Sequence, residues 1–215
     1  MFTTDSLRRL LSAALSAIEA NVDLLNALDS STGDGDHGTA ILTAMKAANN
    51  AAVTTSASLA ETLSAVGWAV MSEASGSTSS LTGSFYMGMS EAAPSDTLSP
   101  DETIAMFESG LKNIRLSTKA AVGDKTLMDA LIPAIGAMTA LKGTGAALPM
   151  IFAAAAKAAR DGAESTKNLA AKFGRAKNLG ERTIGYYDAG AMSTALIHEA
   201  FATVHFLTEA SGQAQ

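Results

Sequence analysis

The chain has 215 residues, of which 47% are hydrophobic, and its formal net charge is −6. This length and apolar content allow one sizeable buried core, so we expect residues 1–215 to form a single ordered domain. The acidic balance and the lack of a lysine and arginine cluster argue against nucleic acids and anionic membranes as partners. The absence of cysteine excludes disulfides, zinc thiolate sites and thiol catalysis.

The sequence carries no sign of export or of a membrane segment. Its N-terminal stretch contains Asp5 where a secretory signal carries positive charge. The longest strongly apolar run, residues 146–156, is about half as long as a membrane span and contains Pro149. We therefore expect a cytoplasmic protein.

The composition of the chain favours helices over strands, since alanine, leucine and methionine are common and only 5% of residues are aromatic. Apolar residues at helical spacing predict a first helix over residues 7–28 and a second over 38–49. A third helix opens at the capping box of Ser58 and Glu61, and a fourth is expected over 81–92.

The second half continues the helical pattern. The stretch Ser99-Pro100-Asp101-Glu102 predicts the start of a fifth helix, with a capping serine, a proline in the first turn and a glutamate three residues after the cap. A sixth helix follows Gly123 and is expected to kink at Pro133 unless that proline lies in its first turns. A seventh is expected over 148–173 and an eighth over 189–207. Without any alternation of period two, these elements predict an all-α, antiparallel up-and-down bundle of eight helices.

Residues 29–38, Asp-Ser-Ser-Thr-Gly-Asp-Gly-Asp-His-Gly, form the most informative segment. Asp29, Asp34 and Asp36 place three carboxylates within eight residues, which is unfavourable unless a cation lies among them. Oxygen ligands favour a hard ion such as Mg²⁺ or Ca²⁺. The segment therefore predicts a divalent metal site, together with the phosphates that such a metal accompanies.

Two other interpretations of this segment compete. An EF-hand calcium loop needs glutamate at its twelfth position. The twelfth residue is Met45 when the count starts at Asp34, and Ala40 when it starts at Asp29, so neither register fits. An acidic surface turn that caps the next helix remains open, because aspartate and glycine are ordinary turn residues.

In an up-and-down array, the loops after the first, third, fifth and seventh helices lie at one end. Lys125, Arg175 and Arg182 bring cations to these loops, although each one taken alone is equally well explained as a solvated surface residue. Glycines and polar residues suited to phosphate recur in all of them. The loops are residues 29–38, 73–80, 118–126 and 174–190. Their convergence predicts a nucleotide site at one end of the bundle.

Three groups of residues carry a resemblance to a known family. They are Asp29…Gly33-Asp34-Gly35-Asp36-His37-Gly38, then Gly123-Asp124-Lys125-Thr126…Asp129, then Gly174-Arg175-Ala176…Leu179-Gly180-Glu181-Arg182…Gly185…Asp188-Ala189-Gly190-Ala191. In order and spacing they resemble the nucleotide-binding L subunits (DhaL family) of dihydroxyacetone kinases over essentially the whole chain. The resemblance implies an eight-helix antiparallel barrel with ADP or ATP and two Mg²⁺ ions at one end.

The resemblance also implies roles for individual residues. Asp29, Asp34 and Asp36 would bind the metal ions for phosphoryl transfer, and Arg175 would add positive charge beside them as a further catalytic residue. Nucleotide contacts are implied for residues of all four loops, namely His37, Gly38, Thr39, Ala40, Ser77, Thr78, Thr118, Leu127, Arg175, Asp188, Ala189 and Gly190.

Two motifs depart from the family pattern. Ser75-Gly76-Ser77-Thr78-Ser79 stands in place of Gly-Gly-x-Ser-Gly, which changes the groups that a phosphate loop offers. Asp188-Ala189-Gly190 stands in place of Asp-Pro-Gly, which removes a rigid turn residue but spares the backbone contacts.

The family further implies that this chain is half of an enzyme. A separate K subunit would hold the acceptor, which is dihydroxyacetone or a tetrulose such as erythrulose. The donor would be exchangeable ATP, or a tightly held ADP that a phosphotransferase-system protein phosphorylates again. A homodimer is a further partner that we consider. The alternative function is a non-catalytic nucleotide sensor, but three intact aspartates favour catalysis because a sensor tolerates the loss of one.

Overall fold

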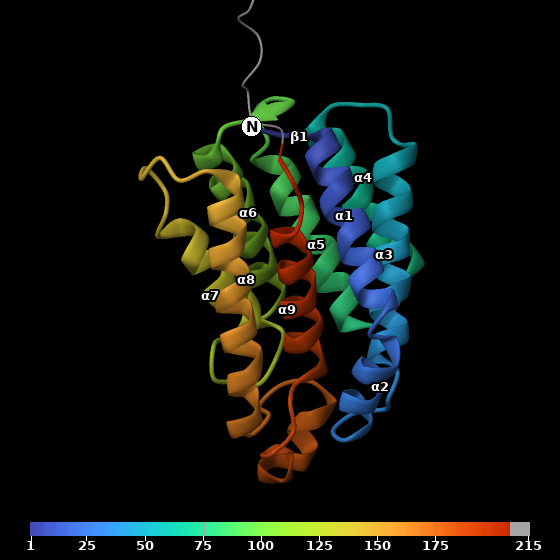
Figure 1. Ribbon diagram of the computed structural model, residues 1–215. Helices are drawn as coiled ribbons and strands as arrows, with labels where there is room; N and C mark the ends of the chain where they lie inside the picture. Colours follow the sequence, from blue (N-terminus) through green and yellow to red (C-terminus); the bar gives the residue numbers. More distant parts are fainter. Residues whose placement is uncertain (75, 207–215) are drawn as a thin grey trace, which may run out of the picture.

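A computed structural model of the protein describes residues 1–74 and 76–206, and these are almost entirely helical (Figure 1). The all-α prediction is confirmed. In chain order the α-helices are α1 (Thr4–Glu19), α2 (Val22–Ser30), α3 (His37–Thr54), α4 (Leu59–Glu73), α5 (Ser77–Glu91), α6 (Pro100–Ser117), α7 (Met128–Thr139), α8 (Leu148–Ser165) and α9 (Ala189–Ala202). Two 3-10 helices, η1 (Thr166–Asn168) and η2 (Arg175–Thr183), lie between α8 and α9.

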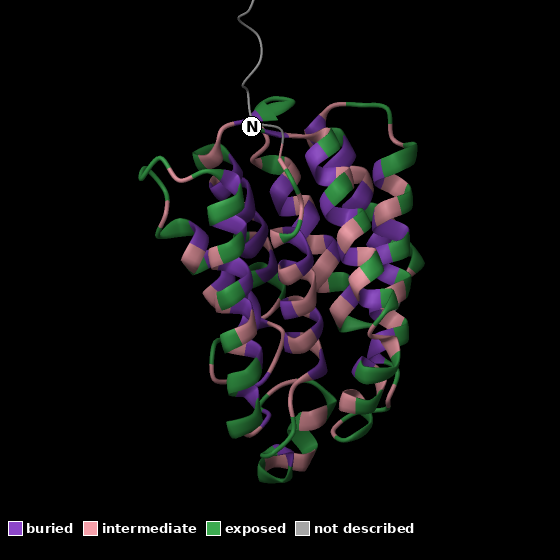
Figure 2. Ribbon diagram, in the orientation of Figure 1, coloured by how far each residue is buried: buried purple, intermediate pink, exposed green. Residues whose placement is uncertain are grey.

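The long helices run up and down along one common direction, as Figure 1 shows. Packing follows the chain: α3 lies against α4, α4 against α5, α5 against α6, and so on to α8 against α9. The last helix, α9, also packs against α1, which itself contacts α3. The described helices thus close around one core, and their buried faces are purple in Figure 2.

The predicted first helix is divided in two by Asn21. The backbone of Asn21, with φ −124° and ψ 13°, leaves the helical region, and its side-chain amide donates to the carbonyl oxygen of Ala17 at 2.8 Å. Asparagine competes with the helical ladder in this way because its short side chain reaches nearby backbone groups. The break makes α2 a separate short helix, and this helix carries Asp29 near its end.

Other helix boundaries also differ from the prediction: α1 begins at Thr4 rather than at residue 7, and α3 ends at Thr54 rather than at 49. Helix α5 begins at Ser77 rather than at residue 81. Helix α8 ends at Ser165 rather than at 173, where the Thr166 hydroxyl donates to the carbonyl oxygen of Ala163 at 2.6 Å and the chain continues as η1. Helix α9 ends at Ala202, and the predicted end at residue 207 lies outside the described residues.

A two-residue antiparallel pair is the one departure from the expectation of no sheet in the described part of the chain. β1 (Phe2–Thr3) pairs with β2 (Thr97–Leu98), and Phe2 and Leu98 lie opposite each other with no exposed surface. Two residues are too few to show an alternating pattern, because the period of two needs several residues to be recognised.

Phenylalanines from four helices form the centre of the core. Phe107 on α6 lies between Phe85 on α5 and Phe152 on α8, with ring centroids 5.9 and 5.6 Å apart in edge-to-face geometry. Phe152 in turn contacts Phe201 on α9 at 6.2 Å. Edge-to-face pairs add stabilisation beyond the area that they bury, so these rings join α5, α6, α8 and α9.

The fold separates two sets of loops. The loops after α2, α6 and α8 lie at the lower end in Figure 1, whereas those after α3, α5 and α7 lie at the upper end with the N-terminus. The turn between α4 and α5 points away from the upper end, because α4 begins there and α5 returns to it. The four polar loops therefore face the same way, as the sequence predicts. None of the helices in the described part of the chain has the length and apolar content needed to span a bilayer.

The aromatic core makes Phe152 a sensitive position. Replacement of Phe152 by alanine is expected to lower the free energy of unfolding by about 3–5 kcal/mol, because a fully buried ring that contacts two helices is lost. Urea denaturation followed by far-UV circular dichroism measures this. The control is Leu116→Ala on α6, at a side chain that is 80% exposed, and a comparable loss in the control would contradict the assignment of the core.

Candidate functional site: an acidic turn at one end of the helices

The turn between α2 and α3 folds around the side chain of Asp29. One carboxylate oxygen of Asp29, Oδ2, accepts hydrogen bonds from the backbone N–H groups of Gly35 at 2.8 Å and Asp36 at 3.1 Å. The carbonyl oxygen of Asp29 also accepts from the N–H of Gly33 at 2.6 Å. As a result, one carboxylate oxygen each of Asp29, Asp34 and Asp36 lies within 4.8 Å of the others.

Two glycines leave room for close contacts around this turn. A side chain at Gly33 would place its Cβ 2.4 Å from Oδ1 of Asp29, within the carboxylate cluster itself. At Gly38 a Cβ would lie 2.2 Å from the carbonyl oxygen of Val22, so only glycine lets the start of α3 approach the start of α2 this closely. The two glycines allow the acidic turn to be compact.

The first turn of α3 is held from both sides. His37 is buried, and its Nε2 lies 2.9 Å from the hydroxyl of Ser193 on α9. Burial lowers the pKa of His37, and the nearby Asp29 raises it in part. On the other side, the backbone N–H of Thr39 donates to the side chain of Asn26 on α2 at 3.1 Å. His37, Gly38 and Thr39 therefore lie beside the acidic turn, as predicted, with Ala40 following them in the same helical turn.

Arg175 reaches the acidic turn from the far part of the chain. It is the first residue of η2, and its guanidinium forms an ion pair with the carboxylate of Asp34. The two side chains remain 70% and 43% exposed, so solvent screens the pair and it contributes little to stability. The ion pair does show that Arg175 and Asp34, which the sequence analysis assigned to one site, lie side by side.

Asp188 caps α9 at the same end of the molecule. Its Oδ2 accepts from the N–H of Ala191 at 2.7 Å. Burial raises the pKa of Asp188 to about 7, and this rise is opposed by the Ala191 hydrogen bond and by Lys125 and supported by Asp129 and Asp29. Burial thus brings the pKa of the Asp188 carboxyl group close to neutral pH.

Leu127 and Gly190 are neighbours in the structure. A Cβ at Gly190 would lie 3.4 Å from the Cβ of Leu127, so the start of α9 and the residue before α7 are in contact. Ala189 is buried at the same junction. Thr118 ends α6, and its hydroxyl accepts from the N–H of Ala120 at 3.1 Å.

Ser77 and Thr78 begin α5, after Gly76 at a φ of +93°. Ser77 is exposed and Thr78 is half-buried. The structure places both in the turn that faces the polar end, and it leaves their contact with phosphate as a prediction. Ser75 of the departing motif lies outside the described residues.

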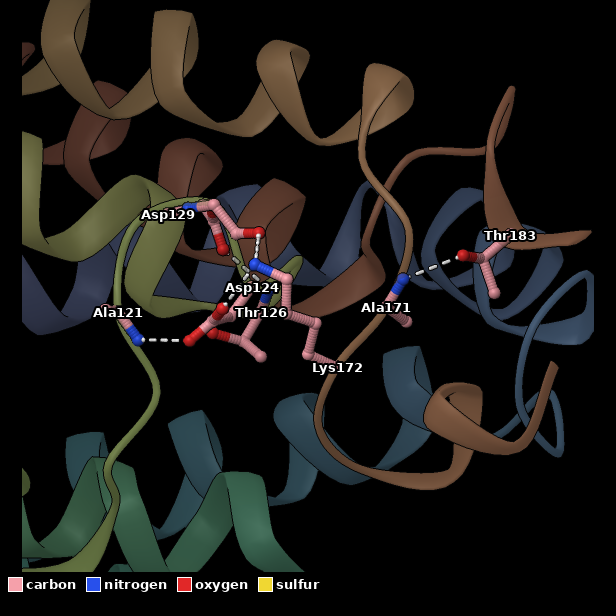
Figure 3. A network of polar contacts seen from close by, with 8 residues as sticks. Ala121, Asp124, Thr126, Asp129, Ala171, Lys172 and Thr183 are labelled. Atoms are coloured by element: carbon pink, nitrogen blue, oxygen red, sulfur yellow. Dashed lines mark hydrogen bonds and ion pairs between the residues drawn. The ribbon is translucent and has the colours of Figure 1, made fainter. Parts of the chain in front are cut away.

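The buried residue Asp129 organises the loop before α7, and sequence reasoning assigned it no role. Its two carboxylate oxygens accept from the N–H groups of Gly123 at 2.6 Å and Thr126 at 2.7 Å, as Figure 3 shows. An acidic residue in the first turn of a helix that follows a Gly-Asp-Lys-Thr loop was the signal that could have found it.

Lys125 is not the solvated surface residue that one interpretation of its loop expected, and its ammonium is engaged inside the protein. Its side chain is 2% exposed, and Nζ donates to the carbonyl oxygens of Thr166 at 2.6 Å and Tyr186 at 2.5 Å. Burial lowers the pKa of Lys125, while Asp188 and Asp129 raise it in part. Its φ of +60° is the only positive value at a non-glycine residue in the described ranges, a conformation that costs on the order of 1 kcal/mol.

The donor set of the acidic turn fits a divalent metal ion. Three carboxylates converge within 4.8 Å, and Arg175 offsets the charge of one of them. Two negative charges remain, presented by oxygen atoms, which is the environment that Mg²⁺ prefers in proteins. Asp29, Asp34 and Asp36 are therefore the residues that could hold such an ion.

The fold and its polar end define an all-helical domain with an acidic turn between two helices. The family described as "DAK2 domain" matches residues 31–203 of this chain. A relative from Listeria innocua, "PEP-dependent dihydroxyacetone kinase 2, ADP-binding subunit DhaL", is 36% identical over 82% of this chain and 83% of its own length. The "L-erythrulose kinase" of Pectobacterium atrosepticum is 33% identical over 90% of this chain, which spans about a third (34%) of that protein.

The solved structures show the same fold. The crystal structure of the dihydroxyacetone kinase from C. freundii in complex with AMP-PNP and Mg²⁺ matches with a TM-score of 0.72 and 24% identity, over 91% of this chain and 33% of that one. This chain belongs to the DAK2 domain family, and the resemblance to its L subunits is confirmed.

The close approach at Gly38 generates a prediction about the site. Gly38→Ala is expected to destabilise the protein by about 1–3 kcal/mol, because the new Cβ would collide with the backbone oxygen of Val22, which cannot move without the helix. Thermal and urea denaturation measure the change. The matched control is Gly136→Ala on α7, where nothing lies within 4 Å of the added atom and helix propensity favours alanine by about 0.5–1 kcal/mol. Equal effects in the two variants would contradict the packing of α3 on α2.

Proposed function

We propose that this chain acts as a single nucleotide-binding domain, the Mg²⁺- and nucleotide-binding subunit of a dihydroxyacetone-type kinase. Together with a K subunit that holds a short-chain ketose, it would transfer a phosphoryl group to that ketose. The observation that carries the proposal is the cluster of Asp29, Asp34 and Asp36 with Arg175 beside it. The names of the relatives support the same reaction class, since they are kinases of dihydroxyacetone or L-erythrulose or subunits of such kinases.

The acidic turn would supply the metal ligands. Asp29 is already oriented by the N–H groups of Gly35 and Asp36, so its carboxylate needs little reorganisation to accept an ion. When bound, the Mg²⁺ ions that the family resemblance implies would offset the negative charge of the β- and γ-phosphate oxygens during transfer. Asp34 and Asp36 are exposed, so a nucleotide could reach them from solvent.

Arg175 would stabilise the charge of the transferring phosphoryl group. Its guanidinium pairs with Asp34 and is largely exposed, so it can exchange a carboxylate partner for phosphate oxygens without leaving the site. The start of α3 at His37–Ala40, the start of α5 at Ser77 and Thr78, and the junction of Leu127 with Asp188–Gly190 surround the same end of the molecule. We infer that these segments, with Thr118, contact the nucleotide.

The names of two relatives support a phosphoryl donor and an acceptor sugar for the reaction. The Listeria relative is named as PEP-dependent and ADP-binding, which supports a tightly held ADP that a phosphotransferase-system protein phosphorylates again. The Pectobacterium relative supports a tetrulose as an acceptor besides dihydroxyacetone. The chain itself contributes the metal ligands and the cation, and the K subunit would select the sugar.

The metal assignment predicts the effect of one isosteric change. Asp34→Asn is expected to abolish Mg²⁺-dependent ADP binding, because an amide supplies no negative charge to the ion, while the helical circular dichroism spectrum stays the same. Isothermal titration of the protein with ADP, with and without MgCl₂, measures this. Asp161→Asn on α8, at an exposed surface aspartate paired with Lys157, is the control and should bind as the unchanged protein does. If Asp34→Asn kept Mg²⁺-dependent binding, the assignment of the ligands would be wrong.

A reconstituted reaction tests the kinase proposal itself. The purified chain, a K subunit, ATP, Mg²⁺ and dihydroxyacetone or erythrulose are expected to give ADP and a sugar phosphate, measured by coupled spectrophotometry. In the phosphotransferase-fed mode, the chain is expected instead to retain ADP through dialysis and to need the phosphorylated donor protein. Bound nucleotide with no turnover under either condition would favour a nucleotide sensor over a kinase.

A further inference from the structure

Residues 166–188 carry Arg175 and connect α8 to α9. We call these residues the arginine segment, and they contain η1 and η2. Its two ends are brought together by a hydrogen bond from the N–H of Gly185 to the carbonyl oxygen of Lys167 at 2.7 Å. The N–H of Asp188 also donates to the hydroxyl of Thr166 at 3.0 Å. The segment is therefore a closed loop with a narrow base.

Lys125 lies inside this base. Its Nζ donates to the carbonyl oxygen of Thr166, at the start of the arginine segment, and to that of Tyr186, near its end. A buried ammonium group that donates to two carbonyls forms strong hydrogen bonds, because charge-assisted bonds gain strength where water is excluded. Lys125 has a positive φ, and its side chain is buried, unlike most lysines, which lie in solvent.

A second contact fastens the arm of the segment that leads to Arg175. The ammonium of Lys172 donates to the carbonyl oxygen of Gly123 at 2.9 Å and to the carboxylate of Asp124 at 3.0 Å. The backbone N–H of Lys172 donates to the carbonyl oxygen of Asp124 at 3.1 Å. Figure 3 shows Lys172 against Asp124, next to the hydrogen bonds by which Asp129 shapes the same loop.

We infer that Lys125, assisted by Lys172, is a positioning residue that sets Arg175 opposite Asp34. The loop at residues 123–126 holds the arginine segment at its base through Lys125 and at its arm through Lys172, three residues before Arg175. Lys125 acts through Arg175 and does not contact phosphate, since its ammonium is buried against two carbonyl oxygens. This inference deepens the proposed function and rests on it only where it concerns the reaction rate.

The first test uses the isolated full chain and needs no nucleotide. Lys125→Met keeps the length and removes the ammonium, and it is expected to speed amide hydrogen exchange in peptides of residues 166–188 by at least about tenfold, with α6 unchanged. Lys177→Met, at an exposed lysine of the same segment, removes the same charge and should leave exchange unchanged. Unchanged exchange in Lys125→Met would overturn the inference, whatever the activity of the protein.

The second test is a double-mutant cycle on the reconstituted reaction. Lys125→Met and Arg175→Met are each expected to lower kcat more than they raise the KM for nucleotide. The double variant should be no slower than Arg175→Met alone, because the lysine acts through the arginine. Multiplicative losses would mean that Lys125 acts independently, and would overturn the inference. No turnover in the unchanged protein would overturn the proposed function instead, and the exchange experiment would still decide the role of Lys125.

If Lys125→Met does not fold, the variant Lys172→Met tests whether the 123–126 loop supports the arginine segment. Lys172 is largely exposed, so Lys172→Met is expected to leave the helical fold intact. It should speed exchange in the arm before η2, with a smaller effect than the loss of Lys125. Exchange equal to that of the unchanged protein would then count against the 123–126 loop as the support of the arginine segment.

Discussion

Mutual repulsion among Asp29, Asp34 and Asp36 is the constraint around which this end of the molecule is built. Carboxylates this close are tolerated only where donors or cations compensate them. Two backbone N–H groups face Asp29, and Arg175 faces Asp34. The compensation is incomplete, and the remaining charge suits a divalent ion. The hydrogen bonds to Asp29 and the ion pair of Arg175 with Asp34 both meet part of this requirement.

The compensation of these carboxylate charges depends on parts of the chain that are far apart in sequence. His37 connects the acidic turn to Ser193 on α9, and the loop before α7 supports the segment from which Arg175 extends. The strained backbone of Lys125 fits this picture, since unfavourable conformations persist where surrounding contacts determine them. Helix packing supplies the frame, while a few polar contacts between loops determine where charges lie.

The elements that could be predicted are those with local causes. The capping boxes at Ser58 and Ser99 are present as read, and each starts a helix at the expected residue. The break at Asn21 and the early end of α8 were missed, because one side-chain hydrogen bond to the backbone decides each and apolar spacing continues through both. In the site, the three aspartates were found through their spacing alone. Asp129 appeared in the sequence only as part of the family motif, and its hydrogen bonds to the loop were not predicted. The contacts of Lys125 were not predicted either, since a lysine is the same residue type whether it is buried or exposed.

The sequence by itself determined the helical class, the up-and-down order and the place of the acidic turn. These depend on the spacing of apolar residues, on caps and on the crowding of like charges, all of which act over a few residues. Only the tertiary structure decided that Arg175 meets Asp34, that Leu127 touches Gly190 and that Lys125 faces two carbonyl groups instead of solvent. Such pairings depend on how α7, α8 and α9 pack. A lysine next to a glycine-rich turn has the same sequence pattern whether its ammonium group is solvated or buried in the protein.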